Sequence, residues 1–309
     1  MGNEIIDNVT EGIGNTNVVR VKTLTGPDDA ELFGKLEYGN PGGSVKDRPA
    51  LFMILAAERL GLLHPGKNEY IVEATSGNTG IGLAMVARVR GYKTVFTMPE
   101  NVSDERKYLL SRVFHSELIL TSKDDGMEGA MRRAEQIERD RGIFYTKQFE
   151  NPANVEAHEL TTGPEIIKAF PDGLDYFVSG VGTGGTITGV GRALRRAFPN
   201  IEIIAVEPDA SPVLSGGKKG LHKITGIGAG FIPPILDQKI YNRIIQVSFE
   251  EAQRTAQALS LEGICVGTSS AAITYAALQV AGGQKGLKVL AILPDHAERY
   301  GSTTLYGDK

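Results

Sequence analysis

The sequence Asn40-Pro-Gly-Gly-Ser-Val-Lys-Asp-Arg-Pro49 joins a glycine-rich turn to an apolar helix, expected over residues 50–60 and ended by Gly61. Pro49 fits the first turn of a helix, because the N–H that proline lacks would have had no partner there. Lys46 is therefore predicted at the positive end of this helix, which disfavours its ammonium form relative to the neutral amine. Schiff-base chemistry needs such an amine. A solvated loop lysine is the alternative interpretation of this stretch alone.

Strand-like and helix-like segments alternate through most of the chain. Strands are expected over residues 69–74, 93–98, 117–120, 143–146, 175–179, 201–206, 243–247 and 288–293, with helices between most of them. One helix is expected over residues 154–168, and another is opened by the capping box Ser248-Phe-Glu-Glu251. This alternation predicts an α/β protein with two lobes and mostly parallel sheets flanked by helices. A Gly/Pro-rich loop over residues 208–237 interrupts it, and loops of that length are usually functional.

The bulk composition is that of an ordinary globular protein with room for about two domains. The chain has 309 residues, a net charge of −4 and a pI of about 5.8, which gives no electrostatic reason to expect nucleic-acid binding. A single cysteine excludes an internal disulfide framework and suits a reducing compartment. No apolar run approaches the roughly 18 residues of a membrane span. We therefore expect a cytoplasmic protein without membrane contact.

The loop Gly180-Val-Gly-Thr-Gly-Gly-Thr186 follows one expected strand and opens a helix. Successive backbone N–H groups at a helix N-terminus form a cradle for phosphate. The loop also matches Gly-x-Gly-x-x-Gly, and Glu207 ends the next strand where a ribose-binding acid of a dinucleotide fold would stand. A nicotinamide dehydrogenase is therefore a competing hypothesis, although the two adjacent glycines and the threonine hydroxyls suit a compact monophosphate better.

A second loop collects small polar side chains at the end of an expected strand. Thr75, Ser76, Asn78 and Thr79 lie together before a helix, where neutral donors and exposed N–H groups suit a carboxylate. Helix capping explains some of these residues but not the whole run. Because loops at the carboxyl ends of parallel strands form the ligand sites of such sheets, the sequence predicts one site between two lobes. The five histidines lack metal-ligand spacing, so no metal is expected.

Taken together, these motifs resemble the fold type II pyridoxal phosphate family, also called the cysteine synthase/cystathionine β-synthase family. Within it the likeness is greatest to cysteine synthase, or O-acetylserine sulfhydrylase, and it extends nearly from end to end. The segments that carry it are Ile13-Gly-Asn-Thr16, Asn40-Pro-Gly-Gly-Ser-Val-Lys-Asp-Arg48, Thr75-Ser-Gly-Asn-Thr-Gly80, Met98-Pro-Glu-Asn101, Gln148-Phe-Glu-Asn-Pro-Ala-Asn154, Thr162-Gly-Pro-Glu165, Gly182-Thr-Gly-Gly-Thr186, Gly226-Ile-Gly-Ala-Gly230, Gly267-Thr-Ser-Ser270 and Glu298-Arg-Tyr-Gly-Ser-Thr303.

The resemblance implies pyridoxal 5'-phosphate as cofactor and gives roles to individual residues. Lys46 would be the Schiff-base lysine and proton carrier, and Asn78 would bond the ring oxygen of the cofactor. Ser269 would face the pyridine nitrogen, where a neutral hydroxyl does not enforce ring protonation and so favours loss of a β-leaving group. The phosphate would contact Gly182, Thr183, Gly184, Gly185 and Thr186, and the substrate would contact Thr75, Ser76, Thr79, Gln148 and Gly226.

The implied reaction is β-replacement, in which O-acetyl-L-serine and sulfide give L-cysteine and acetate. A smaller domain over residues 41–150 would carry the lysine and the substrate loop. A larger domain over residues 1–40 and 151–309 would carry the phosphate cradle and the pyridine-facing serine. The resemblance also implies a homodimer that serine acetyltransferase can bind.

Several alternatives stay open at this stage. The loop 209–242 contains no arginine, the residue that a site for O-phosphoserine would favour, so the acetyl ester is preferred as donor. An O-phosphoserine sulfhydrylase, a cystathionine β-synthase or a cysteine lyase would use the same loops. A non-catalytic scaffold that docks the C-terminus of serine acetyltransferase is the further alternative.

Overall fold

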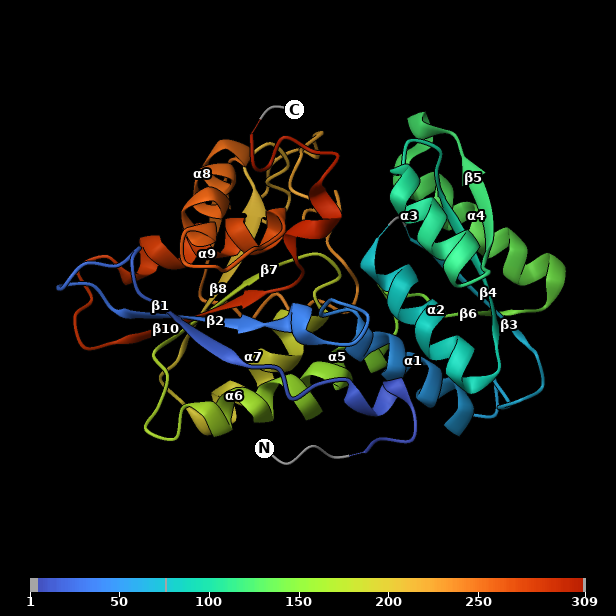
Figure 1. Cartoon of the computed structure of the whole chain (residues 1–309), viewed down its shortest axis with the longest axis horizontal. Helices are drawn as coiled ribbons and strands as arrows, with labels where there is room; N and C mark the ends of the chain where they lie inside the picture. The colour runs from blue at the N-terminus through green and yellow to red at the C-terminus, as the bar shows by residue number, and fades with distance from the viewer. Residues whose placement is uncertain (1–4, 76, 308–309) are drawn as a thin grey trace. The chain divides into compact units, whose positions relative to one another are not determined.

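The computed structural model describes residues 5–75 and 77–307, which form two compact units (Figure 1). Unit 1 comprises Met1–Ile13 and Asn40–Asn154, and unit 2 comprises Gly14–Gly39 and Val155–Lys309. Each unit is an α/β structure with its own sheet. The predicted fold class is confirmed.

Unit 1 is built on a four-stranded parallel sheet in the order β5-β4-β3-β6. Its strands are β3 (Tyr70–Ala74), β4 (Lys93–Pro99), β5 (Glu117–Thr121) and β6 (Phe144–Tyr145), and its longer helices are α1 (Asp47–Arg59), α2 (Asn78–Arg90) and α4 (Gly126–Arg141). One face packs on α1 and α2 through Met53, Leu83 and Phe96, and the other packs on α4 through Val95 and Ala134.

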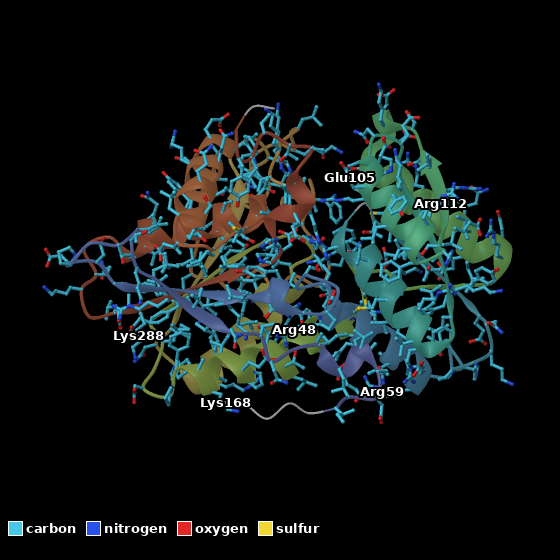
Figure 2. The ribbon with its side chains drawn as sticks, in the orientation of Figure 1. Arg48, Arg59, Glu105, Arg112, Lys168 and Lys288 are labelled. Carbon is cyan, nitrogen blue, oxygen red and sulfur yellow. The ribbon has the colours of Figure 1, made fainter. Side chains whose placement is uncertain are left out.

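Helix α1 shows how the buried face of unit 1 is chosen. Its apolar residues Met53 and Ile54 are fully buried, as the pattern of an amphipathic helix predicts. Arg59 in its last turn is exposed, and its positive charge complements the negative end of the helix dipole. Arg48 in its first turn is instead only 1% exposed (Figure 2).

Unit 2 is built on a six-stranded sheet in the order β1-β2-β10-β7-β8-β9, parallel except for the β1–β2 pair. The strands are β1 (Val18–Val21), β2 (Glu31–Leu36), β7 (Tyr176–Gly180), β8 (Glu202–Pro208), β9 (Arg243–Val247) and β10 (Lys288–Leu293). The helices are α5 (Pro152–Ala157), which begins before the unit boundary, α6 (Gly163–Ala169), α7 (Gly185–Ala197), α8 (Phe249–Ser260) and α9 (Thr268–Ala281). In Figure 1, α8 and α9 cover one face of this sheet and α6 and α7 the other.

The structure departs from the sequence prediction at β1 and β2 and where π-helical turns interrupt expected helices. The strands β1 and β2 were not predicted, because the short run Val18–Val21 gains its order from pairing with β2 rather than from its own pattern. The single helix expected over residues 154–168 is divided into α5, a π-helical turn η5 (His158–Thr162) and α6. Pro164 has no N–H to donate to the preceding turn, so the helical hydrogen bonding changes there.

Within residues 5–75 and 77–307, none of the helices combines the length and apolar character needed to cross a bilayer. Over the same residues, no three or more His, Cys, Asp or Glu side chains are grouped in a way that could hold a metal ion.

Candidate active site

Lys46 occupies the N-cap of α1, which begins at Asp47 and so extends further toward the lysine than the helix expected over residues 50–60. Its N–H donates to Ser44 Oγ at 3.2 Å, and its carbonyl accepts the N–H of Ala50 at 3.1 Å. Helix α2 crosses close to this point, because a Cβ at Gly82 would lie only 3.0 Å from the carbonyl oxygen of Lys46. The absence of a side chain at Gly82 therefore allows α2 to pack closely against the start of α1, where Lys46 lies.

The loop after β3 holds the predicted carboxylate-binding residues of unit 1. Thr75 is buried, its N–H donates to Thr97 O at 3.0 Å, and its Oγ1 accepts the N–H of Gly77 at 3.2 Å. Asn78, half-buried, is the first residue of α2 and Thr79 is the second. Ser76 lies outside the described residues.

Thr79 and Gln148 come together although they are 69 residues apart in the sequence. The Thr79 hydroxyl donates to Gln148 Oε1 at 2.7 Å, and Gln148 Nε2 donates to the carbonyl of Ala74 at 3.1 Å. This pair lies beside β3, which has β4 on one side and β6 on the other. The strand order reverses at β3, and parallel sheets bind ligands at such reversals. The side chain of Gln148 also hydrogen-bonds the Glu73 carboxylate, so Thr79, Ala74 and Glu73 together fix its amide group.

A carboxylate that the sequence analysis did not single out lies beneath this loop. Glu73 in β3 is fully buried, and it accepts hydrogen bonds from Thr146 Oγ1, from Gln148 N at 3.1 Å and from Ala74 N at 2.9 Å. Burial raises the pKa of Glu73 to about 7, although these hydrogen bonds favour the charged form. The only sequence signal was an acidic residue within an otherwise apolar strand.

The raised pKa of Glu73 predicts a pH dependence of stability. Because the folded state binds the proton more tightly than the unfolded chain, where the pKa is about 4.5, the contribution is fully present below pH 4.5 and is lost as the pH rises through 7. The loss amounts to about 3 kcal/mol. We expect urea unfolding at pH 4.5 and pH 8 to show this loss in the wild type but not in Glu73→Gln. Parallel pH profiles for the two proteins would contradict this assignment.

In unit 2 the predicted phosphate loop follows β7 and leads into α7. A Cβ at Gly182 would lie 2.3 Å from the carbonyl oxygen of Gly226, so the backbones touch where a side chain would not fit. Gly184 has a φ of +86°, a conformation that favours glycine, and Gly185 begins the helix and donates its N–H to Thr183 Oγ1 at 3.4 Å. These residues thus form a glycine turn at the positive end of a 13-residue helix.

Ser269 and Gly226 are neighbours in the same unit. Ser269 lies in the first turn of α9 and is 2% exposed, and a Cβ at Gly226 would lie 3.5 Å from its Oγ. The adjacent residues Thr225 and Thr268 tie the two segments together through a 3.0 Å bond from Thr225 N to Thr268 Oγ1. The glycine loop, Gly226 and Ser269 are therefore brought together within unit 2.

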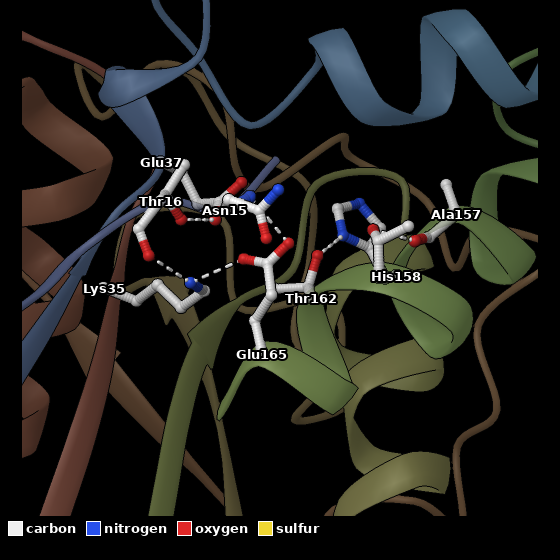
Figure 3. A network of polar contacts seen from close by, with 9 residues as sticks. Asn15, Thr16, Lys35, Glu37, Ala157, His158, Thr162 and Glu165 are labelled. Carbon is white, nitrogen blue, oxygen red and sulfur yellow. Dashed lines mark hydrogen bonds and ion pairs between the residues drawn. The ribbon is translucent and has the colours of Figure 1, made fainter. Parts of the chain in front are cut away.

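His158 is a second buried residue that sequence reasoning missed, since a lone histidine carries no motif. Its Nε2 lies 3.2 Å from Thr186 Oγ1. Its Nδ1 lies 2.9 Å from Thr162 Oγ1 (Figure 3). The imidazole therefore connects the phosphate loop to the π-helical turn η5. Helix α7 packs closely on this segment, because a Cβ at Gly189 would lie 2.3 Å from Val155 O.

An ion pair between the buried Lys35 and the half-buried Glu165 anchors the helix that follows η5. Lys35 Nζ lies 2.8 Å from Glu165 Oε2 and donates to Thr16 O at 2.8 Å, while Glu165 Oε1 accepts the N–H of Asn15 at 2.9 Å (Figure 3). Asn15 has a φ of +49°, a strained conformation that the Glu165 carboxylate stabilises. The side chain of Glu165 thus links the motif at residues 162–165 to the motif at residues 13–16.

Residues 9–295 match the family of pyridoxal-phosphate dependent enzymes, and the chain belongs to this family. A cysteine synthase from Staphylococcus aureus is 51% identical over 309 residues, 99% of either chain. A solved cysteine synthase from Entamoeba histolytica is 40% identical with a TM-score of 0.93, covering 99% of this chain and 92% of that one. The structure of an O-ureido-L-serine synthase is also 40% identical, with a TM-score of 0.95 and coverages of 98% and 96%. The predicted identification with the cysteine synthases of the fold type II family is confirmed.

Proposed function

We propose that the chain catalyses the cysteine synthase reaction, the conversion of O-acetyl-L-serine and sulfide to L-cysteine and acetate. The observation that carries this proposal is the 51% identity to a cysteine synthase over 99% of the chain. The cofactor is pyridoxal 5'-phosphate. Unit 1 is the domain of the lysine and the substrate loop, and unit 2 is the domain of the phosphate loop and the pyridine-facing serine.

The residues of unit 2 fit the cofactor. The loop Gly182–Thr186 offers backbone N–H groups at a helix N-terminus, and its glycine backbones approach closely enough to exclude side chains. The buried hydroxyl of Ser269 is a neutral partner for the pyridine nitrogen. When bound, pyridoxal 5'-phosphate supplies the electron sink that stabilises negative charge at the substrate α-carbon. Asn78 in unit 1 is assigned to its ring oxygen.

The other residues of unit 1 bind the substrate and move a proton. The amine of Lys46 anchors the cofactor and, once released, removes the α-proton of the amino-acid substrate and later returns one. Thr75, Ser76, Thr79 and Gln148 hold the substrate carboxylate, which fixes the α-carbon relative to the lysine. Gly226 in unit 2 also contacts the substrate.

The preference for the acetyl ester rests on the loop after β8. Residues 209–242 contain lysines but no arginine that could bind a phosphate bidentately. Lys223, one of these lysines, has its Nζ over the ring of Phe249, 5.2 Å from the centroid. A neutral ester therefore suits this loop better than a phosphate ester.

The proposed function is tested with the purified chain and pyridoxal 5'-phosphate. We expect visible absorbance from the bound cofactor and formation of L-cysteine from O-acetyl-L-serine and sulfide. O-phospho-L-serine with sulfide, L-serine with homocysteine, and L-cysteine alone should react more slowly. Faster turnover of any of these substrates would identify the chain as the enzyme of the family that uses that substrate. Cofactor binding without turnover would favour a non-catalytic scaffold.

A dinucleotide-dependent dehydrogenase is disfavoured by the position of Glu207. Its buried carboxylate accepts the N–H of Leu214 at 2.8 Å and the N–H of Ser215 at 3.1 Å, so it is used by its own loop rather than offered to a ribose. The proposal also includes a homodimer in the cytoplasm that binds serine acetyltransferase, and mass measurement in solution with and without that enzyme tests both associations.

The contact between His158 and Thr186 predicts a loss of cofactor affinity in His158→Ala. Removal of a buried hydrogen-bond partner leaves the threonine hydroxyl without its orienting contact, and we expect the dissociation constant for pyridoxal 5'-phosphate to rise about tenfold. His64→Ala, at an exposed histidine of unit 1, is the control. Equal cofactor affinity in the two variants would exclude a positioning role for His158.

A further inference from the structure

Gln148, to which the proposed function gives a substrate contact, follows a strained turn. Lys147 has a φ of +50°, in the left-handed region that a non-glycine residue enters at a cost in energy. Such a conformation persists only where the surrounding structure holds it, and strained residues of this kind cluster at functional sites. The contacts that hold Lys147 therefore decide where the amide of Gln148 points.

The carboxylate of Glu73 contacts both neighbours of this strained residue. Its Oε2 accepts the hydroxyl of Thr146 and, at 3.1 Å, the N–H of Gln148, while its Oε1 accepts the N–H of Ala74 at 2.9 Å. Glu73 thus joins β3 to the turn after β6 from inside unit 1. Its side chain is completely buried, so no solvent competes for these bonds.

Two asparagine side chains also hydrogen-bond the backbone of this turn. Asn151 Nδ2 donates to the carbonyl of Thr146 at 2.9 Å, and Asn154 Nδ2 donates to the carbonyl of Gln148 at 2.8 Å. The asparagine amide groups donate to carbonyl groups of the turn, whereas Glu73 accepts hydrogen bonds from it. Glu73 therefore holds donor groups of the turn that these two amide groups do not bind.

We propose that Glu73 is a positioning residue that sets the affinity for the amino-acid substrate by holding the turn Thr146–Gln148, so that Gln148 bonds Thr79 and presents its amide to the substrate carboxylate. This inference rests on the proposed function. Glu73 itself touches neither the substrate nor the cofactor, and it acts through Gln148. Its loss should therefore raise KM for the amino-acid substrate more than it lowers kcat.

The test uses the holoenzyme of Glu73→Gln, in which an amide of the same shape cannot accept all three bonds. We expect KM for O-acetyl-L-serine to rise about tenfold while kcat, KM for sulfide and cofactor affinity stay within about twofold. Glu58→Gln is the matched control, because Glu58 is a largely buried carboxylate of the same unit that instead bonds Tyr92 Oη at 2.8 Å. It should leave KM for O-acetyl-L-serine unchanged.

Thr146→Val provides a second variant should Glu73→Gln fail to fold. It removes one donor to Glu73 without a change of charge, and KM for O-acetyl-L-serine should rise about threefold. A wild-type KM in the folded Glu73 or Thr146 variant, a loss confined to kcat, or an equal rise in Glu58→Gln would overturn the inference. If the wild-type holoenzyme itself does not turn over O-acetyl-L-serine, it is the proposed function that fails.

Discussion

Replacement of Lys46 by alanine should abolish turnover of O-acetyl-L-serine with sulfide, with kcat/KM falling by about 10³-fold or more. A positioned acid–base group contributes about 10²- to 10⁴-fold by itself, and this lysine also provides the covalent anchor for the cofactor. Lys46 makes no side-chain capping hydrogen bond, and alanine provides the same backbone at this N-cap beside Gly82. The variant should therefore keep the fold. Steady-state kinetics of the holoenzyme measure the loss.

The matched control for this prediction is Lys67→Ala, which removes an exposed lysine of the same unit and should keep wild-type activity. Borohydride treatment followed by peptide mapping gives a readout independent of turnover, since the cofactor should be retained covalently on the peptide that contains Lys46. Retention on another lysine, or more than about a tenth of wild-type kcat/KM in Lys46→Ala, would contradict the assigned role.

Replacement of Gly182 by alanine should weaken cofactor binding about 30- to 150-fold. The added Cβ would lie 2.3 Å from the carbonyl oxygen of Gly226, and a backbone oxygen cannot move aside as the end of a flexible side chain can. Overpacking of this kind costs about 1–3 kcal/mol, and we expect the upper part of this range because two functional loops are displaced together. Titration of the cofactor-free full-length chain with pyridoxal 5'-phosphate measures the effect.

Gly301→Ala is the control for the glycine substitution, because a Cβ at that position meets no atom within 4 Å and the residue has a φ of −60°. Its cofactor affinity should equal that of the wild type. The displacement of Gly226 in Gly182→Ala should also raise KM for O-acetyl-L-serine. Unchanged cofactor affinity in Gly182→Ala would show that the loop does not hold the phosphate.

Local sequence patterns were sufficient for most of the elements. A helix following Lys46, the strand β10 and the capping box at Ser248 are all predicted from residues within one or two turns, and the structure has each of them, although α1 begins at Asp47 rather than at residue 50. The edge strand β1 was missed, because its order comes from pairing with β2. The π-helical turn η5 was missed as well, although Pro164 was visible in the sequence.

The sequence by itself determined the chemical character of the candidate site: a lysine before a helix, two polar or glycine-rich loops after strands, and a serine in the first turn of another helix. Motifs of this kind are local, so they can be identified without the fold. Only the tertiary structure decided which distant groups support them, namely Glu73 beneath Gln148 and His158 against Thr186. These partners are single buried residues from remote segments. A contact across a sheet or between helices requires no fixed spacing of residues, so no sequence pattern reveals it.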